Sequence, residues 1–263
     1  MIPERPTLDD PEWVDFADHL ARYLFAMGYV ANKSVLVAGS GPGYGASLLK
    51  AGGARSVQGV DIDPQSIQKA NERFSALGIT FFTDDCEQLT QVQCPIDVVC
   101  SFENIEHLAQ PQRFLAAAGK LLAPGGVLLI STPDRAATPP FVNGRPSNPY
   151  HHHEWYAAEF NELLAKYFGS VVLKSQVKSV SLVRRSEATR ALIGYLKRTN
   201  PLARAVGALS YLATKKSYWR DIRALAAPAI SDYPIVDSTI ASLLGSPWCH
   251  YAICTNPLGA VVS

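Results

Sequence analysis

Short apolar runs alternate with amphipathic stretches along the first two thirds of the chain. Apolar runs bounded by glycine, proline or charged residues are typical of buried strands, and apolar residues recurring every three or four positions indicate helices. We expect strands at 34–39, 57–62, 79–83, 96–102, 126–132 and 170–178, and helices at 11–28, 45–52, 64–77, 110–122 and 156–167. This alternation predicts a doubly wound, Rossmann-like α/β fold with helices on both faces of a mostly parallel sheet.

A long segment after the strand at 170–178 breaks the alternation. It is punctuated by proline and favours helices at 187–197, 201–213, 218–226 and 235–244. We therefore divide the chain into four parts: an N-terminal helical segment (1–33), a Rossmann-like core (34–183), a helical insertion or lid (184–247), and a last core strand with a tail (248–263).

The first strand runs directly into a glycine-rich turn, SVLVAGSGPGYG at 34–45. Glycine adopts positive φ freely and has no Cβ, so a ligand can approach the main chain. A strand, such a turn and a helix N-terminus together favour an adenosine-bearing cofactor. The second strand ends at Asp61, where a carboxylate can accept hydrogen bonds from ribose hydroxyls. A nicotinamide dinucleotide site has the same spacing, so these features alone leave both cofactors open.

Five stretches in this order resemble the class I S-adenosylmethionine-dependent methyltransferases. They are VLVAGSGPGYG, GVDIDP, FFTDDCEQL (81–89), IDVVCSFENIEHL (96–108) and LLAPGGVLLISTPDR (121–135). The phrase NPYHHHEWYAAEF (148–160) is similar to bacterial methyltransferases of polysaccharide, sugar and secondary-metabolite pathways. The resemblance implies S-adenosylmethionine as cofactor and a seven-stranded sheet whose last strand is antiparallel. The downstream stretches have no reason to accompany a hydride-transfer site.

The resemblance also implies which residues bind the cofactor. Asp61 would bind the ribose, Ile62 would pack on the adenine, and Asp85 would accept from the adenine amino group. The Cys86 backbone N–H would face a ring nitrogen, and Phe102 would line the pocket. The full expected set is Gly39, Ser40, Gly41, Gly43, Asp61, Ile62, Asp85, Cys86 and Phe102.

One position departs from the family pattern. Family members usually carry Asp or Glu two residues before the first glycine, where this chain has Val37. That carboxylate commonly interacts with the amino group of the cofactor. Because Asp61 and Asp85 are present, we expect another residue to compensate. A non-catalytic cofactor-binding relative is the alternative that Val37 leaves open.

Methyl transfer to a hydroxyl requires a group that takes the proton, and histidine suits this role near neutral pH. Two candidate catalytic sites compete, and both follow strands whose carboxyl ends share one edge of the sheet. His107 follows the fourth strand, and His151 with Glu154 lies in the loop after the fifth.

A metal ion is a further alternative at this edge. The stretch Glu103-Asn-Ile-Glu106-His107 is similar to ubiquinone-pathway O-methyltransferases, in which such residues can hold a divalent ion. Adjacent histidines in a loop rarely all face one ion, and the sequence has no paired-cysteine signature. We expect no metal site.

Charge is distributed unevenly along a chain whose net charge is only +1. Residues 184–223 hold ten Lys or Arg against two acidic residues, a net charge of +8. A solvated helical surface would explain this, and so would a lid that recruits an anionic sugar or an anionic surface. The odd number of cysteines, five, and their apolar neighbours favour reduced thiols in the cytoplasm. We expect no transmembrane segment, and the start of the chain is unlike a signal peptide.

Together these features predict a cytoplasmic methyltransferase that acts on a small molecule or glycan precursor, most readily at oxygen. A quinone or other lipid-like acceptor, held under the insertion at a membrane surface, is the alternative substrate class. We do not expect a nucleic acid substrate, because Ser101-Phe-Glu-Asn104 stands where an amine-recognition tetrapeptide would follow the fourth strand.

Overall fold

The computed structural model describes residues 17–179, 235–238, 241 and 245–258. The helices are α1 (Ala17–Ala26), α2 (Tyr44–Ala51), α3 (Pro64–Phe74), α4 (Pro111–Leu121) and α5 (Ala157–Ala165), with 3-10 turns η2 (Met27–Tyr29), η3 (Ser75–Leu77) and η4 (Ile105–His107). The strands are β1 (Ser34–Ala38), β2 (Ser56–Asp61), β3 (Ile79–Thr83), β4 (Ile96–Phe102), β5 (Leu122–Pro133), β6 (Phe168–Ser179), β7 (Ile235–Asp237) and β8 (Gly245–Pro257).

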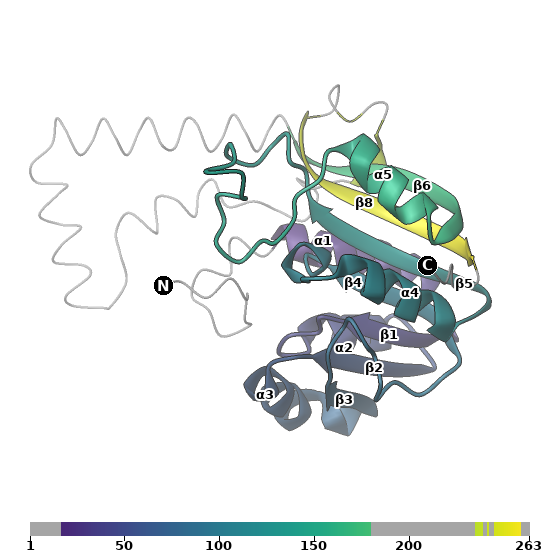
Figure 1. Cartoon of the computed structure of the whole chain (residues 1–263). Coiled ribbons are helices and arrows are strands. Elements are labelled where there is room, and N and C mark those ends of the chain that lie inside the picture. The colour runs from purple at the N-terminus through teal and green to yellow at the C-terminus, as the bar shows by residue number, and fades with distance from the viewer. Residues whose placement is uncertain (1–16, 180–234, 239–240, 242–244, 259–263) are drawn as a thin grey trace, which may run out of the picture.

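The strands form one sheet in the order β3-β2-β1-β4-β5-β8-β6-β7 (Figure 1). The first five are parallel, whereas β8 runs antiparallel to both β5 and β6, and β7 runs antiparallel to β6. The mixed α/β, Rossmann-like fold predicted from the sequence is confirmed. The strand count was wrong, since the sheet has eight strands where the resemblance implied seven.

The extra strand is β7, which lies within a stretch predicted as the helix at 235–244. Ile235, Val236 and Asp237 pair with Gln176, Ser175 and Lys174 of β6 at the sheet edge. The β-branched side chains Ile235 and Val236 suit a strand at such a position, so pairing with β6 overrides the helical pattern. The other three helices expected in the insertion, at 187–197, 201–213 and 218–226, lie outside the described residues, as do residues 1–16 of the N-terminal segment.

Local sequence explains the core elements well. All five residues of β1, SVLVA, are buried, as expected for a parallel strand covered on both faces. Helix α3 begins where Asp63 caps it by accepting from the backbone N–H groups of Gln65 and Ser66, each at 3.2 Å. Pro64 occupies the first helical position, where the missing N–H costs nothing.

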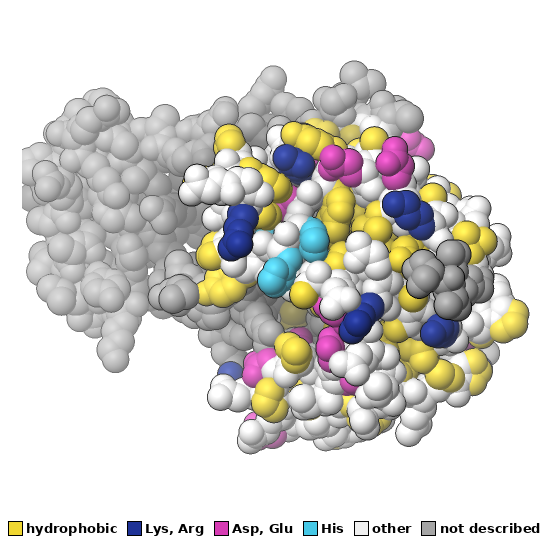
Figure 2. All heavy atoms as spheres, viewed as in Figure 1, with side chains coloured by type: hydrophobic (Ala, Val, Ile, Leu, Met, Phe, Trp, Pro, Cys, Tyr) yellow, Lys and Arg dark blue, Asp and Glu magenta, His cyan; other side chains and the backbone are white. Residues whose placement is uncertain are grey.

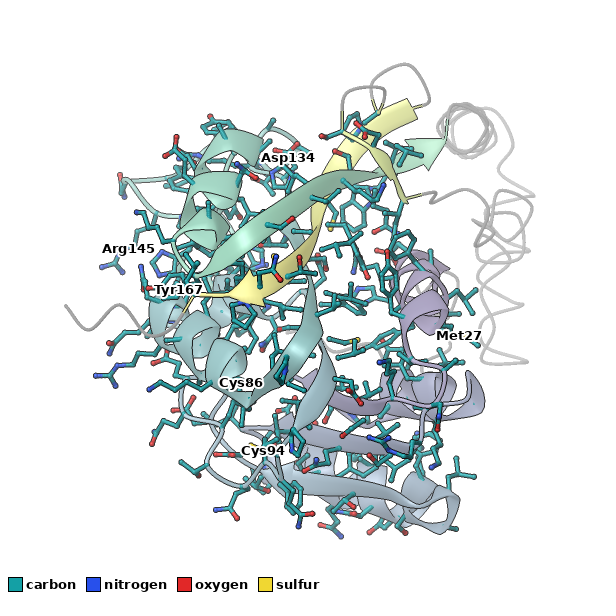
Figure 3. All side chains as sticks on the ribbon, turned by 90° about the vertical axis from the view of Figure 1, so that its right-hand side faces the viewer. Met27, Cys86, Cys94, Asp134, Arg145 and Tyr167 are labelled. Atoms are coloured by element: carbon teal, nitrogen blue, oxygen red, sulfur yellow. The ribbon has the colours of Figure 1, made fainter. Side chains whose placement is uncertain are left out.

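Helices cover both faces of the sheet and bury two separate clusters of apolar side chains. One cluster joins α1, α2 and α3 to the sheet and includes Val37, Phe102 and Tyr251. The other joins α4 and α5 to the opposite face and includes Leu36 and Phe160. Figure 3 shows α4 and α5 on one side of the sheet and α1 on the other. Among the described helices, none has the length and apolar character needed to cross a bilayer.

The order of the strands determines where a ligand can bind. From β1 the chain steps outward to β2 and β3, then returns to place β4 and β5 on the other side of β1. The carboxyl ends of β1 and β4 therefore flank a reversal of strand order, which is where ligands bind in open α/β sheets.

Helix α1 packs closely on the first turn of α2. The ring of Tyr23 occupies the space where a Cβ on Gly45 would lie. Tyr23 also makes edge-to-face ring contacts with Tyr44 at 5.5 Å and Phe102 at 5.0 Å, so its ring has little room to move.

We therefore predict that Gly45→Ala destabilises the protein by about 1–3 kcal/mol, the usual cost of overpacking a tight core. The measurement is the free energy of unfolding in urea. Gly28→Ala is the matched control, because a Cβ there would have no atom of the described part of the chain within 4 Å. Equal stability of Gly45→Ala and Gly28→Ala would show that α1 and α2 are not closely packed.

Candidate active site

The glycine turn and Asp61 are fixed to each other by backbone hydrogen bonds. The N–H groups of Gly39 and Ser40 donate to the Val60 carbonyl at 2.9 and 2.8 Å. The Asp61 carboxylate accepts from the Gly41 N–H at 2.8 Å and from the Asp63 N–H at 2.9 Å. The structure thus brings the turn after β1 and the carboxylate at the end of β2 together, as the sequence predicted.

The residues around this turn fit an adenosine-bearing cofactor. At Gly41, which has φ +51°, a Cβ would have no atom of the described residues within 4 Å, so the main chain is open there. Ile62, directly after Asp61, exposes 66% of its surface, which is unusual for a large aliphatic side chain beside a buried carboxylate. An open backbone, an acceptor and an apolar face are what a nucleoside needs for close approach, ribose binding and base stacking.

The residues expected at the adenine lie in a turn after β3. Asp85 is partly buried and accepts from the Glu87 N–H at 2.9 Å and the Gln88 side-chain amide at 3.2 Å. Neighbouring Asp84 accepts from the Gln91 N–H at 2.7 Å, so it ties the loop together. Cys86 is buried, and burial raises the pKa of its thiol to about 12. The role of Asp85 and Cys86 in adenine binding stays a prediction.

Gly43 and Phe102 serve the packing around the turn. A Cβ on Gly43 would meet the Phe81 ring at 2.8 Å and the Ala70 side chain at 2.9 Å, so glycine is required there. Phe102 is buried between Tyr23 and Tyr251, whose ring centroids lie 5.0 and 5.4 Å from its own. Its expected position at the pocket wall stays a prediction.

The two candidate catalytic histidine sites come together in space. The rings of His107 and His151 meet edge to face with centroids 5.0 Å apart. Nδ1 of His151 lies 2.9 Å from Glu154, and the hydroxyl of Thr138 donates to the other Glu154 oxygen at 2.6 Å. Figure 2 shows histidine side chains reaching the surface next to basic side chains. From the sequence, these histidines were alternative candidates for the catalytic site, whereas in the structure they belong to one cluster.

The hydrogen-bond partners assign a tautomer to each ring. His107 Nδ1 lies 3.0 Å from the Tyr150 carbonyl, which can only accept, so this nitrogen carries the proton. The lone pair of neutral His107 is therefore on Nε2. His151 uses both nitrogens, with Nδ1 on Glu154 and Nε2 3.0 Å from the Asn148 side-chain amide.

Glu106 lies beneath the histidines as a fully buried carboxyl group. The Thr132 hydroxyl donates to its Oε2 at 3.0 Å, while Oε1 has no hydrogen-bond partner among the described residues. Burial, and then the nearby Glu103 carboxylate, raise the pKa of Glu106 well above its ordinary value. Both causes favour the protonated form of this side chain.

Glu106, His107 and His151 are the metal-binding candidates among the described residues. Their potential ligand atoms lie within 4.8 Å of one another. A metal needs deprotonated ligands with available lone pairs. The raised pKa of Glu106 favours its protonated form, and both nitrogens of His151 are engaged. Metal binding would have to break these contacts, and the expectation of no metal site stays a prediction.

A second group of charges was missed by the sequence analysis. Arg22 of α1 is fully buried, with Asp18 one helical turn away and Glu103 after β4 beside it. The i,i+4 spacing of Asp18 and Arg22 on a helix was the available signal, since such pairs lie on one face. Arg22 is nevertheless flanked in the sequence by Ala21 and Tyr23, and the neighbouring residues do not indicate that the helix face with Asp18 and Arg22 is buried.

The raised pKa of Glu106 gives a testable pH dependence. The folded chain keeps this proton above the ordinary value of 4.5, where the unfolded chain loses it, so the group lowers stability as pH rises through this range. Glu106→Gln removes the titration. We predict that the unfolding free energy of Glu106→Gln, relative to that of the wild type, increases between pH 4 and 8. The increase is about 1.4 kcal/mol for each unit by which the pKa of Glu106 is raised.

Urea unfolding at each pH measures this difference. Glu162→Gln is the control, because Glu162 is exposed on α5 and should follow wild type at every pH. A constant difference between Glu106→Gln and wild type across the pH range would contradict the neutral carboxyl group.

Comparison with known proteins places this site in context. The family model described as "Methyltransferase domain" matches residues 14–180. A probable S-adenosylmethionine-dependent methyltransferase of Mycolicibacterium smegmatis is 40% identical over 136 residues, which cover 51% of each chain. A relative of the same description from Mycobacterium tuberculosis is 36% identical over 134 residues, which cover 50% of this chain and 47% of the relative. The match thus spans about half the length of these relatives.

A more distant relative and two solved structures complete the comparison. A ubiquinone biosynthesis O-methyltransferase of Coxiella burnetii is 32% identical over 157 residues, covering 51% of this chain and 67% of the relative. An S-adenosylmethionine-dependent methyltransferase structure from Mesorhizobium loti has a TM-score of 0.54 at 18% identity, over 68% of this chain and 94% of that one. A Haemonchus contortus phosphoethanolamine N-methyltransferase in complex with S-adenosylhomocysteine has a TM-score of 0.56 at 16% identity, over 89% and 52%. These structures support the fold.

Proposed function

Because the chain belongs to the methyltransferase domain family, we propose that it transfers a methyl group from S-adenosylmethionine to an oxygen of a small molecule or glycan precursor. Two predictions from the sequence are confirmed by the family match and the relatives. The domain is an S-adenosylmethionine-dependent methyltransferase domain, and its cofactor is S-adenosylmethionine. The acceptor and the methylated atom are the parts that we propose.

The observation that supports methylation at oxygen is the hydrogen-bonded histidine cluster at the ends of β4 and β5. S-adenosylmethionine, when bound, supplies a methyl group that its sulfonium makes electrophilic. The chain has to orient the acceptor hydroxyl and receive its proton. In our proposal His107 Nε2 takes that proton, because the Tyr150 carbonyl holds the other ring nitrogen protonated.

The remaining cluster residues would position His107. Glu154 and Asn148 fix the plane of the His151 ring, and that ring packs edge to face on His107. The Thr138 hydroxyl holds Glu154 in turn. His151 and Glu154, which the sequence named as candidate catalytic residues, would therefore orient the base.

A cation in the same loop as this cluster, Arg135, supports an anionic acceptor. The Arg135 guanidinium lies 4.1 Å from the Phe141 ring centroid and 4.7 Å from the Tyr156 centroid. The Thr138 hydroxyl, which donates to Glu154, also lies 3.2 Å from the Arg135 carbonyl oxygen. A guanidinium held by rings keeps in-plane N–H donors that suit a carboxylate or phosphate. We therefore favour a uronic acid or phosphorylated sugar as acceptor.

The ubiquinone biosynthesis O-methyltransferase relative favours a second candidate, a quinone or other lipid-like acceptor at a membrane surface. The apolar and basic residues of the insertion on which that candidate depends lie outside the described residues. An acceptor screen that includes quinones in detergent beside acidic and neutral sugars separates the two classes.

The first test concerns the cofactor. We predict that the protein binds S-adenosylhomocysteine in calorimetric titration and that Asp61→Ala abolishes binding. The Asp61 carboxylate holds the glycine turn and, in our proposal, also binds the ribose. Asp97→Asn is the control, since Asp97 is partly exposed and accepts from the Ser34 N–H at the other end of β1. A folded wild type that binds no S-adenosylhomocysteine would disprove the proposed function.

The second test concerns the base. With an acceptor from the screen, we predict that His107→Ala lowers kcat by about 10²–10⁴-fold, the usual contribution of a general base. Its affinity for S-adenosylhomocysteine should stay at the wild-type value. Glu154→Gln should lower kcat less, and His152→Ala, which alters an exposed neighbour, should leave it unchanged. An unchanged kcat in His107→Ala would remove His107 from the mechanism.

A further inference from the structure

We propose that His250 is a positioning residue for the histidine cluster, an inference that rests on the proposed function for its catalytic meaning. In this proposal His250 fixes the base of the loop at 134–156 and, through that loop, the tautomer and orientation of His107. His250 lies on β8, far along the chain from the cluster. Its side chain is buried, with 1% of its surface exposed, so it reaches the cluster only through neighbouring residues.

One ring nitrogen of His250 contacts both ends of the loop. Nε2 lies 3.1 Å from the Trp155 carbonyl oxygen and 3.3 Å from Oδ1 of Asp134. Because a carbonyl oxygen and an ionised carboxylate can only accept, Nε2 carries the proton and lies between two acceptors. Asp134 begins the loop and Trp155 is close to its end, and the two residues also form an isolated parallel bridge. His250 therefore closes the loop at its base.

The Asp134 carboxylate is a suitable acceptor for this role. Burial alone would raise its pKa, but the contact with His250 and the hydrogen bond from the Ala136 N–H outweigh burial and hold the pKa below its ordinary value. Oδ1 accepts from the Ala136 N–H at 2.8 Å. The backbone N–H of Asp134 donates to the Trp248 carbonyl of β8 at 2.9 Å. Asp134 is thus ionised at neutral pH and joined to β8 through two different groups.

Consecutive contacts connect Asp134 to the histidine cluster. The Asp134 carbonyl accepts from the Thr138 N–H at 3.2 Å. The Thr138 hydroxyl donates to Glu154 at 2.6 Å, and the other Glu154 oxygen lies 2.9 Å from Nδ1 of His151. The His151 ring meets the His107 ring edge to face. A displacement of Asp134 would therefore reach His107 through this chain of contacts.

The loop has a second attachment, at the turn after β4. The N–H groups of His152 and His153 donate to the Glu106 carbonyl at 2.8 and 3.2 Å. The nearby Tyr150 carbonyl lies 3.0 Å from Nδ1 of His107 and holds that nitrogen protonated. His107 keeps this tautomer only while the loop stays against the turn. Loosening the base of the loop would remove one of its two attachments.

Aromatic packing is the competing explanation for a buried histidine at this position. The His250 ring stacks on Phe160 with centroids 5.9 Å apart, and Phe160 packs on Trp155 at 5.8 Å. His250→Phe keeps a ring and loses the N–H donor. His250→Gln loses the ring and keeps an amide N–H donor at a reach similar to that of Nε2. The two variants therefore separate packing from hydrogen bonding.

The experiment is long-range proton–nitrogen NMR of the imidazole rings in the full chain, which distinguishes a protonated from an unprotonated ring nitrogen. His107→Gln assigns the signals of His107. We expect neutral His107 to be a single Nδ1–H tautomer in the wild type and in His250→Gln. In His250→Phe both tautomers should be populated, because the Tyr150 carbonyl is no longer held in place.

Kinetics give a second readout with an acceptor from the screen. We expect kcat of His250→Phe to fall by up to about 10²-fold, the cost of misplacing a catalytic group by roughly 1 Å. KM for S-adenosylmethionine should stay at the wild-type value, and His250→Gln should recover most of kcat. If the proposed function fails and no acceptor is methylated, the tautomer measurement still tests the role of His250, because it needs no acceptor.

Gln58→Leu is the matched control, because Gln58 also closes a loop, through two hydrogen bonds of 2.8 Å to the backbone of Gln93. It should leave the His107 tautomer unchanged. An unchanged tautomer in folded His250→Phe, or an equal change in His250→Gln or Gln58→Leu, would overturn the inference.

Circular dichroism shows whether His250→Phe folds. If it does not, Asp134→Ala replaces it, because Asp134 is partly exposed and its loss removes one acceptor of the His250 N–H. We expect Asp134→Ala to populate both tautomers of His107. A single Nδ1–H tautomer in folded Asp134→Ala would then overturn the inference.

Discussion

The close approach of Gly39 to Asn104 is the contact on which the carboxyl edge of the sheet depends. The Asn104 side chain fills the space that a Cβ on Gly39 would take, so the end of β1 and the segment after β4 lie against each other. On one side of this contact, Ser40 and Gly41 donate hydrogen bonds to Val60 and Asp61. On the other side, Glu103 and Glu106 lie before and after Asn104 in the chain and lead to the buried charges. Glycine is required there both for this contact and for its φ of +74°.

Buried charge separates the edge into two parts with different chemistry. On the α1 side, Glu103 stays ionised because a guanidinium and a hydroxyl stabilise it. Three residues further on, burial and then the nearby Glu103 carboxylate raise the pKa of Glu106 and so favour its protonated form. Neighbouring carboxyl groups with opposite protonation states are a common way to divide tasks within one site.

Much of this could be predicted from local sequence. The all-apolar run of β1, the proline at the start of α3 and the glycine turn each have a local cause, so their positions were confirmed within a few residues. Strand β7 could not be predicted, because three residues become a strand only through pairing with β6. The burial of Arg22 was hidden for a similar reason, since it depends on α1, β6 and the segment after β4 meeting. His107 and His151 were found singly, but their contact arises from the return of the 134–156 loop.

The pairing of β6 with β7 has a consequence for how such a protein can change over time. Ile235 of β7 pairs with Gln176 near the end of β6, so the chain between these two strands leaves and re-enters the sheet at nearby points. The entropy of closing a loop grows only slowly with its length. The intervening segment could therefore be lengthened, shortened or replaced with little effect on the sheet or the glycine turn. Descendants could acquire new acceptors by exchanging this one stretch while inheriting an unaltered cofactor fold.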